Sequence, residues 1–250
     1  MSEAAQALSI SERIMEGIKV KTVFTVHAFG SNMDISDTVV STWIVMAILI
    51  LAALLLTRRL REIPKKPQLL LEAFVGFIND FVTENAGHHG RDFAAFLGTI
   101  FTFLIAANLA PMLTPVGVSI GGFVAEPVFV IKPLTRDINV TAAFAVTVIV
   151  TVLLSGIRYK GILGWLKGLA SPIPIMLPFN IMEYAIKPLS LCLRLFGNIL
   201  GAYIIMLLIE AVAPVLFPPI AGLYFDLFDG LIQAVVFAYL STIYVAEAIE

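Results

Sequence analysis

Arg194 is the residue whose type and position most directly indicate chemistry in this chain. It is the only charged residue in an apolar run at 189–209, which is long enough for a helix to cross a bilayer core of about 30 Å. A guanidinium in the middle of such a span costs about 2.5–3.5 kcal/mol on insertion scales, and it keeps its proton there. A permanent cation at bilayer depth therefore predicts a functional site.

Polar residues line one face of the helix expected around Arg194. At about 100° per residue, Glu183, Lys187, Ser190 and Asn198 lie within about 40° of it. Glu183 and Lys187 come near the cytoplasmic end, where we expect their heads to reach surface water. This leaves Ser190, Arg194 and Asn198 as the polar residues at depth.

A second polar stripe follows the last apolar segment, with Gln233 in its middle. On a straight helix, Asp226, Asp229, Tyr244 and Glu247 all fall within about 40° of the same line. In lipid such a stripe must face protein or a water-filled path. We expect Asp226, Asp229 and Gln233 to serve a path from the outer side, and Tyr244 and Glu247 one from the inner side.

Structural explanations of these residues stay open. Arg194 could pair with Asp226 or Asp229 and simply hold two helices together. Asn198 and Gln233 could form ordinary interhelical hydrogen bonds, worth about 0.6–2 kcal/mol in membranes.

Glu210, the histidine pair and the cysteine lie off the stripes. On a straight helix, Glu210 points about 160° away from Arg194. It lies near the outer end, where we expect it either to line the entrance of an ion path or to contact interfacial water. His88 and His89 are adjacent, a spacing more typical of a surface loop than of a metal site. The single Cys192 excludes an internal disulfide and a cysteine metal cluster. Without a nucleotide-binding or nucleophile motif, we expect no catalytic residue, no metal and no cofactor.

The composition predicts an integral membrane protein. Of 250 residues, 59% are hydrophobic and 14% are charged, against roughly 25% charged in soluble domains. The net charge of −2 gives no indication of nucleic-acid binding. Residues 1–38 show neither a signal-peptide nor a transit-peptide pattern, which favours a bacterial plasma membrane.

We predict one all-α membrane domain with five transmembrane helices and an interfacial amphipathic helix at 67–85. From residue 175 to 212, a helix is about 57 Å long, so it must tilt, extend beyond the core, or bend at Pro178 or Pro188. The last two helices are long, tilted and antiparallel, which brings Arg194 and Gln233 to similar depth. The crossings are expected at residues 39–57, 93–113, 140–157, 175–212 and 219–249.

Basic residues after the first and third crossings predict the orientation. By the positive-inside rule both loops lie in the cytoplasm, so the N-terminal segment 1–38 lies outside and the C-terminus inside. The residues concerned are Arg58, Arg59, Arg61, Lys65 and Lys66 in one loop, and Arg158, Lys160 and Lys167 in the other.

Three segments resemble subunit a of the F-type ATP synthases. SLCLRLFGN (190–198) is similar to its most diagnostic stretch, LIQAVVF (231–237) to its final helix, and DINVTAAFAV (137–146) to the start of the preceding hairpin helix. The resemblance implies an ion-translocating stator subunit, in which Arg194 matches the essential arginine that faces the rotor ring of c subunits. It also implies that Asn198 lies beside an outer half-channel and that Gln233 lies near the arginine.

The sequence departs from the family pattern on the outer side. Some members carry an acidic residue nine positions after the arginine, where this chain has Tyr203, and some carry a histidine seven positions before the glutamine, where it has Asp226. We therefore expect a rewired outer path that uses Asp226, Asp229 and Glu210. The resemblance also implies partners: the c-ring, the peripheral-stalk b subunits and the rest of the ATP synthase, with catalysis on other subunits.

Two other classes of protein stay open. One is a secondary transporter that binds an anion at Arg194, although we find no inverted repeat and no pair of broken helices. The other is a structural scaffold, which the two aligned polar stripes disfavour. The residues do not distinguish H⁺ from Na⁺ as the coupling ion.

Overall fold

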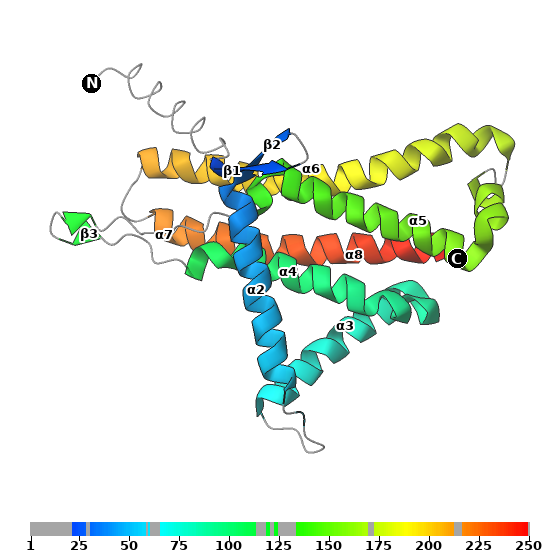
Figure 1. Cartoon of the computed structure of the whole chain (residues 1–250), viewed down its shortest axis with the longest axis horizontal. Coiled ribbons are helices and arrows are strands. Elements are labelled where there is room, and N and C mark those ends of the chain that lie inside the picture. The colour runs from blue at the N-terminus through cyan, green and yellow to red at the C-terminus, as the bar shows by residue number, and fades with distance from the viewer. Residues whose placement is uncertain are drawn as a thin grey trace.

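The computed structural model consists mainly of long helices (Figure 1). It describes residues 22–28, 31–58, 60, 66–113, 119–120, 123–124, 134–169, 173–212 and 217–249. The α-helices are α2 (Asp37–Thr57), α3 (Lys66–Gly90), α4 (Ala94–Leu113), α5 (Ile138–Leu169), α6 (Leu177–Val212), α7 (Phe217–Gly222) and α8 (Gly230–Ile249).

Within the described ranges, 5 helical segments are long and apolar enough to cross a membrane. This confirms the predicted all-α membrane fold. The segments are Asp37–Thr57, Arg91–Pro111, Ile138–Leu169, Pro174–Ile209 and Ile220–Ile249.

The crossing helices follow two directions. In Figure 1, α4, α5, α6 and α8 run alongside one another, while α2 crosses them at a steep angle. The 21 residues of α2 span about 32 Å, which matches a bilayer core, whereas the 36 residues of α6 span about 54 Å. If α2 follows the membrane normal, α6 and its neighbours are strongly tilted.

Helix α6 is continuous, so the possible bend at Pro178 or Pro188 does not break it. Pro178 is the second residue of the helix, a position where a missing backbone N–H removes no helical hydrogen bond. Pro188 lies inside the helix. Helix α8 runs antiparallel to α6 (Figure 1), and residues of both helices belong to one buried core.

The segment before α8 is not a regular α-helix. Residues Leu223–Asp229 form the π-helix η4 between α7 and α8. A π-turn contains more residues per turn than an α-turn. The straight-helix angle expected for Asp226 relative to Gln233 therefore changes across η4, whereas the residues from Asp229 to Gln233 follow the start of the regular helix α8.

Helix α5 turns sharply at Gly161. This glycine has φ 70°, a left-handed conformation that costs other residues energy because of their Cβ atom. Residues 162–169 therefore form a second arm of α5, which lies across one end of the helix bundle (right-hand side of Figure 1). The sequence predicted a third crossing only as far as residue 157.

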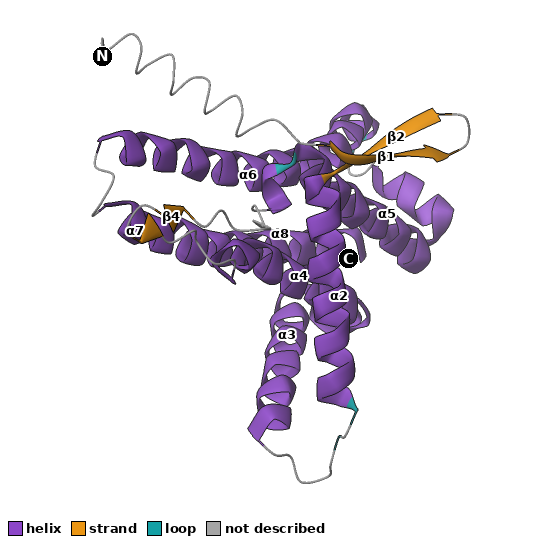
Figure 2. Cartoon of the chain, turned by 60° about the vertical axis from the view of Figure 1, so that its left-hand side comes forward, coloured by secondary structure: helices purple, strands orange, loops and turns teal. Residues whose placement is uncertain are grey.

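Two short antiparallel hairpins accompany the helices, and the sequence predicted neither. One pairs β1 (Thr22–Ala28) with β2 (Ser31–Ser36), and the other pairs β3 (Ser119–Ile120) with β4 (Phe123–Val124). Figure 2 shows β1 and β2 beside the start of α2.

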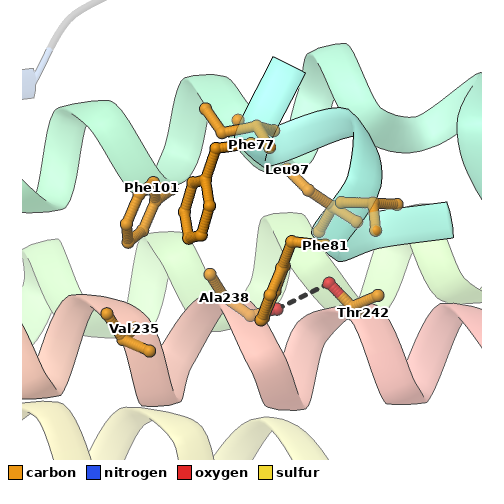
Figure 3. Close-up of a pocket in the computed structure, with 10 residues that line it drawn as sticks. Phe77, Phe81, Leu97, Phe101, Val235, Ala238 and Thr242 are labelled. Carbon is orange, nitrogen blue, oxygen red and sulfur yellow. Dashed lines mark hydrogen bonds between the residues drawn. The ribbon is translucent and has the colours of Figure 1, made fainter. Parts of the chain in front are cut away.

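The second half of α3 packs against α4 and α8. Phe81 points toward α8 beside Ala238 and Thr242, and Phe77 and Phe101 lie above them (Figure 3). Together with their neighbours they line an apolar cavity of about 30 Å³. At the other end of α3, Leu70 is 77% exposed.

Candidate functional site

Arg194 lies exposed on α6. Within the part of the chain that the structure describes, it forms no ion pair. The structural pairing with Asp229 that the sequence left open is therefore absent. The side chain of Asp226, the other partner considered, lies outside the described residues.

Asn198 and Gln233 join α6 to α8 next to Arg194. Asn198 Nδ2 donates a hydrogen bond of 2.7 Å to Gln233 Oε1. Gln233 is 3% exposed, whereas Asn198, one turn from Arg194, is exposed. This bond places Gln233 at the depth of the arginine, as the antiparallel arrangement predicted.

Two glycines leave space beside Arg194 on the surface of α6. A Cβ atom added to Gly197 or Gly201 would meet nothing within 4 Å. Leu193, which directly precedes the arginine, is 52% exposed. The surface around Arg194 is therefore open within this chain, and small residues there let another helix approach closely.

Lys187 does not extend to surface water, contrary to expectation. Its Nζ lies 3.0 Å from Glu183 Oε1 and 2.8 Å from Glu247 Oε2, and it lies 5.2 Å from the ring centroid of Tyr244. The Lys187 side chain is only 10% exposed, whereas that of Glu247 is 54% exposed. The ammonium is instead covered by the carboxylates of Glu183 and Glu247, which are themselves about half exposed. Ser190 lies half-buried one turn further along α6.

The outer side is only partly described. Tyr203 is half-buried, with the Arg136 guanidinium 4.9 Å from its ring centroid. Asp229 is half-buried at the end of η4. The side chains of Asp226 and Glu210 lie outside the described residues.

A buried polar network holds the start of α8. Asn108 Nδ2 donates to the Gly230 carbonyl at 3.0 Å, and Thr135 Oγ1 donates to Asn108 Oδ1 at 2.9 Å. Asn108 was not among the site residues predicted from the sequence, although a lone amide in an apolar crossing helix indicates an internal contact.

The starts of α2 and α5 are also tied together. Asp137 Oδ1 accepts a bond of 2.9 Å from the Asn139 backbone N–H, and Asp137 Oδ2 accepts one of 2.6 Å from Thr38 Oγ1. Both Asp137 and Thr38 are buried.

The fold and the site together define a class of protein. It is a multi-pass membrane protein whose central cation is unpaired within the described chain and open on one surface. An ionisable residue at bilayer depth marks a functional site.

Comparisons with known proteins identify the family. The sequence model of the ATP synthase A chain matches residues 39–246. A subunit a from Propionigenium modestum, described as sodium ion specific, is 33% identical over 223 residues, which cover 87% of this chain and 75% of that relative. Subunit a from Moorella thermoacetica is 36% identical over 219 residues, covering 87% and 93%. Subunit a 2 from Picosynechococcus sp. is 37% identical over 216 residues, covering 86% of each.

The chain belongs to the ATP synthase subunit a family, the ion-translocating stator subunit of the membrane sector. It is thus a subunit that assembles with the rest of an ATP synthase.

Proposed function

We propose that this chain forms two half-channels against a ring of c subunits and couples the flow of H⁺ or Na⁺ to rotation of that ring. A carboxylate on the rotor crosses lipid in its neutral form, either protonated or with a bound cation. An opposite charge within about 4–6 Å favours the ionised carboxylate. Arg194 therefore releases the ion toward the inner half-channel during synthesis, and the carboxylate reloads from the outer one.

The observation that carries this proposal is the exposure of Arg194 without a partner in the described chain. A guanidinium locked to its own chain would have its charge compensated already, and it would act weakly on a passing carboxylate. The open surface at Gly197 and Gly201 supports the close approach of a rotor helix. The fixed charge also blocks a direct ion leak between the half-channels.

The remaining candidates divide between the two half-channels. Asn198 and Gln233 lie at the centre, where the two paths come closest to the arginine. Ser190, Tyr244 and Glu247 belong to the inner half-channel. The outer half-channel takes Asp226, Asp229, Glu210 and Tyr203.

The basic residues after α2 and in the second half of α5 support an orientation with residues 1–38 outside and the C-terminus in the cytoplasm. We also propose that the membrane is a bacterial plasma membrane. Peripheral-stalk b subunits would hold the chain against rotation. Each elementary charge that crosses supplies about 2.3 kcal/mol per 100 mV, so several must cross for each ATP made elsewhere in the complex.

Replacement of Arg194 tests the proposal. In inverted vesicles that carry the complete ATP synthase, Arg194→Ala should leave the complex assembled and abolish ATP-driven ion pumping. Leu193→Ala is the matched control on the same exposed face, and it should keep pumping. Retained pumping in Arg194→Ala would refute the proposal, and a failure of only that variant to assemble would favour a scaffold.

Sodium dependence distinguishes the two coupling ions. The relative from Propionigenium modestum is described as sodium ion specific. ATP hydrolysis by the purified complex is measured at fixed pH while the Na⁺ concentration is varied. Stimulation by Na⁺ identifies Na⁺ as the coupling ion, and an unchanged rate identifies H⁺.

A further inference from the structure

The last turns of α5 before Gly161 carry an apolar ridge that ends in a cation. Along this helix, exposed residues recur at every fourth position, which is the spacing of one ridge on a helix surface. Val146, Val150 and Leu154 are exposed members of this ridge. The next member is Arg158, which is also exposed. The ridge is thus apolar along the membrane span and ends in a side chain that stays charged.

The second arm of α5 continues this surface beyond the turn at Gly161. Its residues Ile162, Leu163 and Leu166 are exposed, and at about 100° per residue they share one face of the arm. Gly168, on the opposite side of the arm, lines a polar cavity of about 170 Å³ between the arm, α6 and α8. The arm therefore has a protein side and an apolar outer side, as a helix at a membrane interface does.

Contacts with the bundle fix the direction in which the arm faces. Trp165 Nε1 donates a hydrogen bond of 3.3 Å to Tyr184 Oη, and Asn180 Nδ2 donates one of 2.8 Å to the Leu169 carbonyl. The indole also packs on Gly156, where an added Cβ atom would lie 3.0 Å from Trp165 Cδ1. These contacts hold the apolar side of the arm facing away from α6 and α8.

The basic residues of this surface are not neutralised by their neighbours. Residues 138–182 contain three basic residues and no aspartate or glutamate. Arg158 and Lys167 are exposed and form no ion pair among the described residues. Asp92 accepts a hydrogen bond of 2.6 Å from Tyr159 Oη and does not pair with Arg158. The surface therefore carries an excess of positive charge.

Lys160, the third basic residue, belongs to the polar cavity behind the arm. It lines that cavity together with Lys187, Glu183 and Glu247, so the formal charges of the cavity sum to zero. The cavity is therefore neutral by itself. The excess positive charge of the outer surface lies on the other two basic residues.

The arm is attached to the part of α6 that leads toward one membrane boundary. Tyr184 and Asn180 precede Arg194 on the continuous helix α6 by about 15 Å and about 21 Å of helix rise. Half of the hydrocarbon core is about 15 Å thick. The tilt of α6 shortens this distance across the membrane, and the long side chains of Arg158 and Lys167 extend the reach of their charges toward the headgroups.

We propose that this outer surface of α5 and its arm binds an anionic phospholipid of the inner leaflet, with the phosphate beside Arg158 and Lys167. The acyl chains cover the apolar residues, and the headgroup supplies the negative charge that the described residues do not provide. A phospholipid combines both properties in one molecule, and basic sites between helices on the cytoplasmic side bind such headgroups. The inference depends on the proposed orientation of the chain and not on the mechanism of ion coupling.

Photo-cross-linking in the complete ATP synthase tests the lipid site. Benzoylphenylalanine replaces Leu163, which is 76% exposed on the arm. The complex is reconstituted into vesicles of equal amounts of phosphatidylglycerol and phosphatidylcholine with the same acyl chains. After irradiation, mass spectrometry of this subunit measures the ratio of its adducts with the two lipids. The control carries the cross-linker in place of Ile48 on α2, which is 57% exposed and far in the sequence from any basic residue.

Phosphatidylglycerol should be favoured by about fivefold or more in place of Leu163, because one basic residue near an anionic lipid contributes about that factor. The ratio in place of Ile48 should be close to one. Arg158→Gln combined with Lys167→Gln should lower the ratio on the arm to the control value, whereas Arg158→Lys combined with Lys167→Arg should preserve it. If the variant at Leu163 does not assemble, Ile162, which is exposed on the same side of the arm, takes its place.

Three results would overturn the lipid site. They are equal ratios on the arm and on α2, a preference that survives both glutamine substitutions, and cross-links mainly to another protein subunit. The last result would identify the surface as a protein interface. The stator function is tested separately, because the adduct ratio is measured without pumping and Arg194→Ala does not alter this surface.

Discussion

The hydrogen bond between Asn198 and Gln233 should couple α6 to α8 measurably. We consider Asn198→Ala, Gln233→Ala and the double variant. The donor and acceptor are 2.7 Å apart, and Gln233 is 3% exposed, so loss of Asn198 leaves a buried amide oxygen without this donor. The two residues therefore form a pair whose energy a double-mutant cycle can isolate.

The expected coupling follows from this geometry. Leaving a buried polar group unpaired costs about 1–3 kcal/mol. Interhelical hydrogen bonds in membranes average about 0.6 kcal/mol and reach about 1.7 kcal/mol in double-mutant cycles. Because the bond is short and one partner is buried, we expect a coupling of about 1–1.7 kcal/mol, in the upper part of that range.

Denaturation of the purified subunit in mixed micelles with increasing SDS measures this coupling through the fluorescence of Trp43 and Trp165. The control cycle combines Asn198→Ala with Ser241→Ala, because Ser241 is buried on α8 but donates to the Phe237 carbonyl of its own helix. Variants that do not interact add within about 0.3–0.5 kcal/mol. A coupling within that limit for Asn198 and Gln233 would refute the interhelical bond as a stabilising contact.

Further predictions concern the buried network and the start of α5. A Cβ atom on Gly230 would lie 2.9 Å from Asn108 Cβ, whereas one on Gly197 meets nothing, so Gly230→Ala should be less stable than Gly197→Ala by about 1–3 kcal/mol in the same SDS titration. Asp137→Ala removes a helix cap, worth about 0.5–2 kcal/mol, and the acceptor of Thr38. Thermal unfolding should therefore shift down more in Asp137→Ala than in Asp137→Asn, and equal shifts would contradict the capping role.

The sequence was sufficient to predict the fold class. Helical periodicity and the length of an apolar run depend only on the bilayer and on the geometry of a helix. They predicted Arg194 at bilayer depth, and the antiparallel order of the last two helices predicted Gln233 at a similar depth. The structure then shows Gln233 bonded to Asn198. These are features in which local pattern and global fold agree.

The pairing of Lys187 depended on tertiary structure. Its second carboxylate, Glu247, is 60 positions away in the chain, and only the packing of α6 against α8 brings them together. The sequence places Lys187 and Glu247 at the inner ends of the two predicted polar stripes, and their opposite charges indicate that they could pair. The sequence predicted that the head of Lys187 reaches surface water, whereas the structure covers it with the carboxylates of Glu183 and Glu247, which are themselves about half exposed.

The irregular backbone could not be read from local sequence. A glycine in a helical pattern is compatible both with a continuing helix and with a turn, so Gly161 did not reveal the arm of α5. The π-helix η4 has no simple residue signature, yet its larger number of residues per turn changes the helical angle between Asp226 and Gln233. Such π-helical insertions are frequent at functional sites. The assumption of a regular α-helix before Gly230 was therefore wrong.

The charges in the described crossing helices are compensated unequally, and this difference has a mechanistic consequence. Lys187 has two carboxylates, and Asp137 accepts hydrogen bonds from two residues, whereas Arg194 has no ion-pair partner in the described chain. A lone guanidinium at bilayer depth costs about 2.5–3.5 kcal/mol, and no carboxylate of the described residues forms an ion pair that offsets that cost. A fixed internal carboxylate would offset it permanently and hold the arginine in one state. In the proposed rotary mechanism the partner must instead be exchanged at every step, and the lack of an ion pair to Arg194 among the described residues fits that requirement.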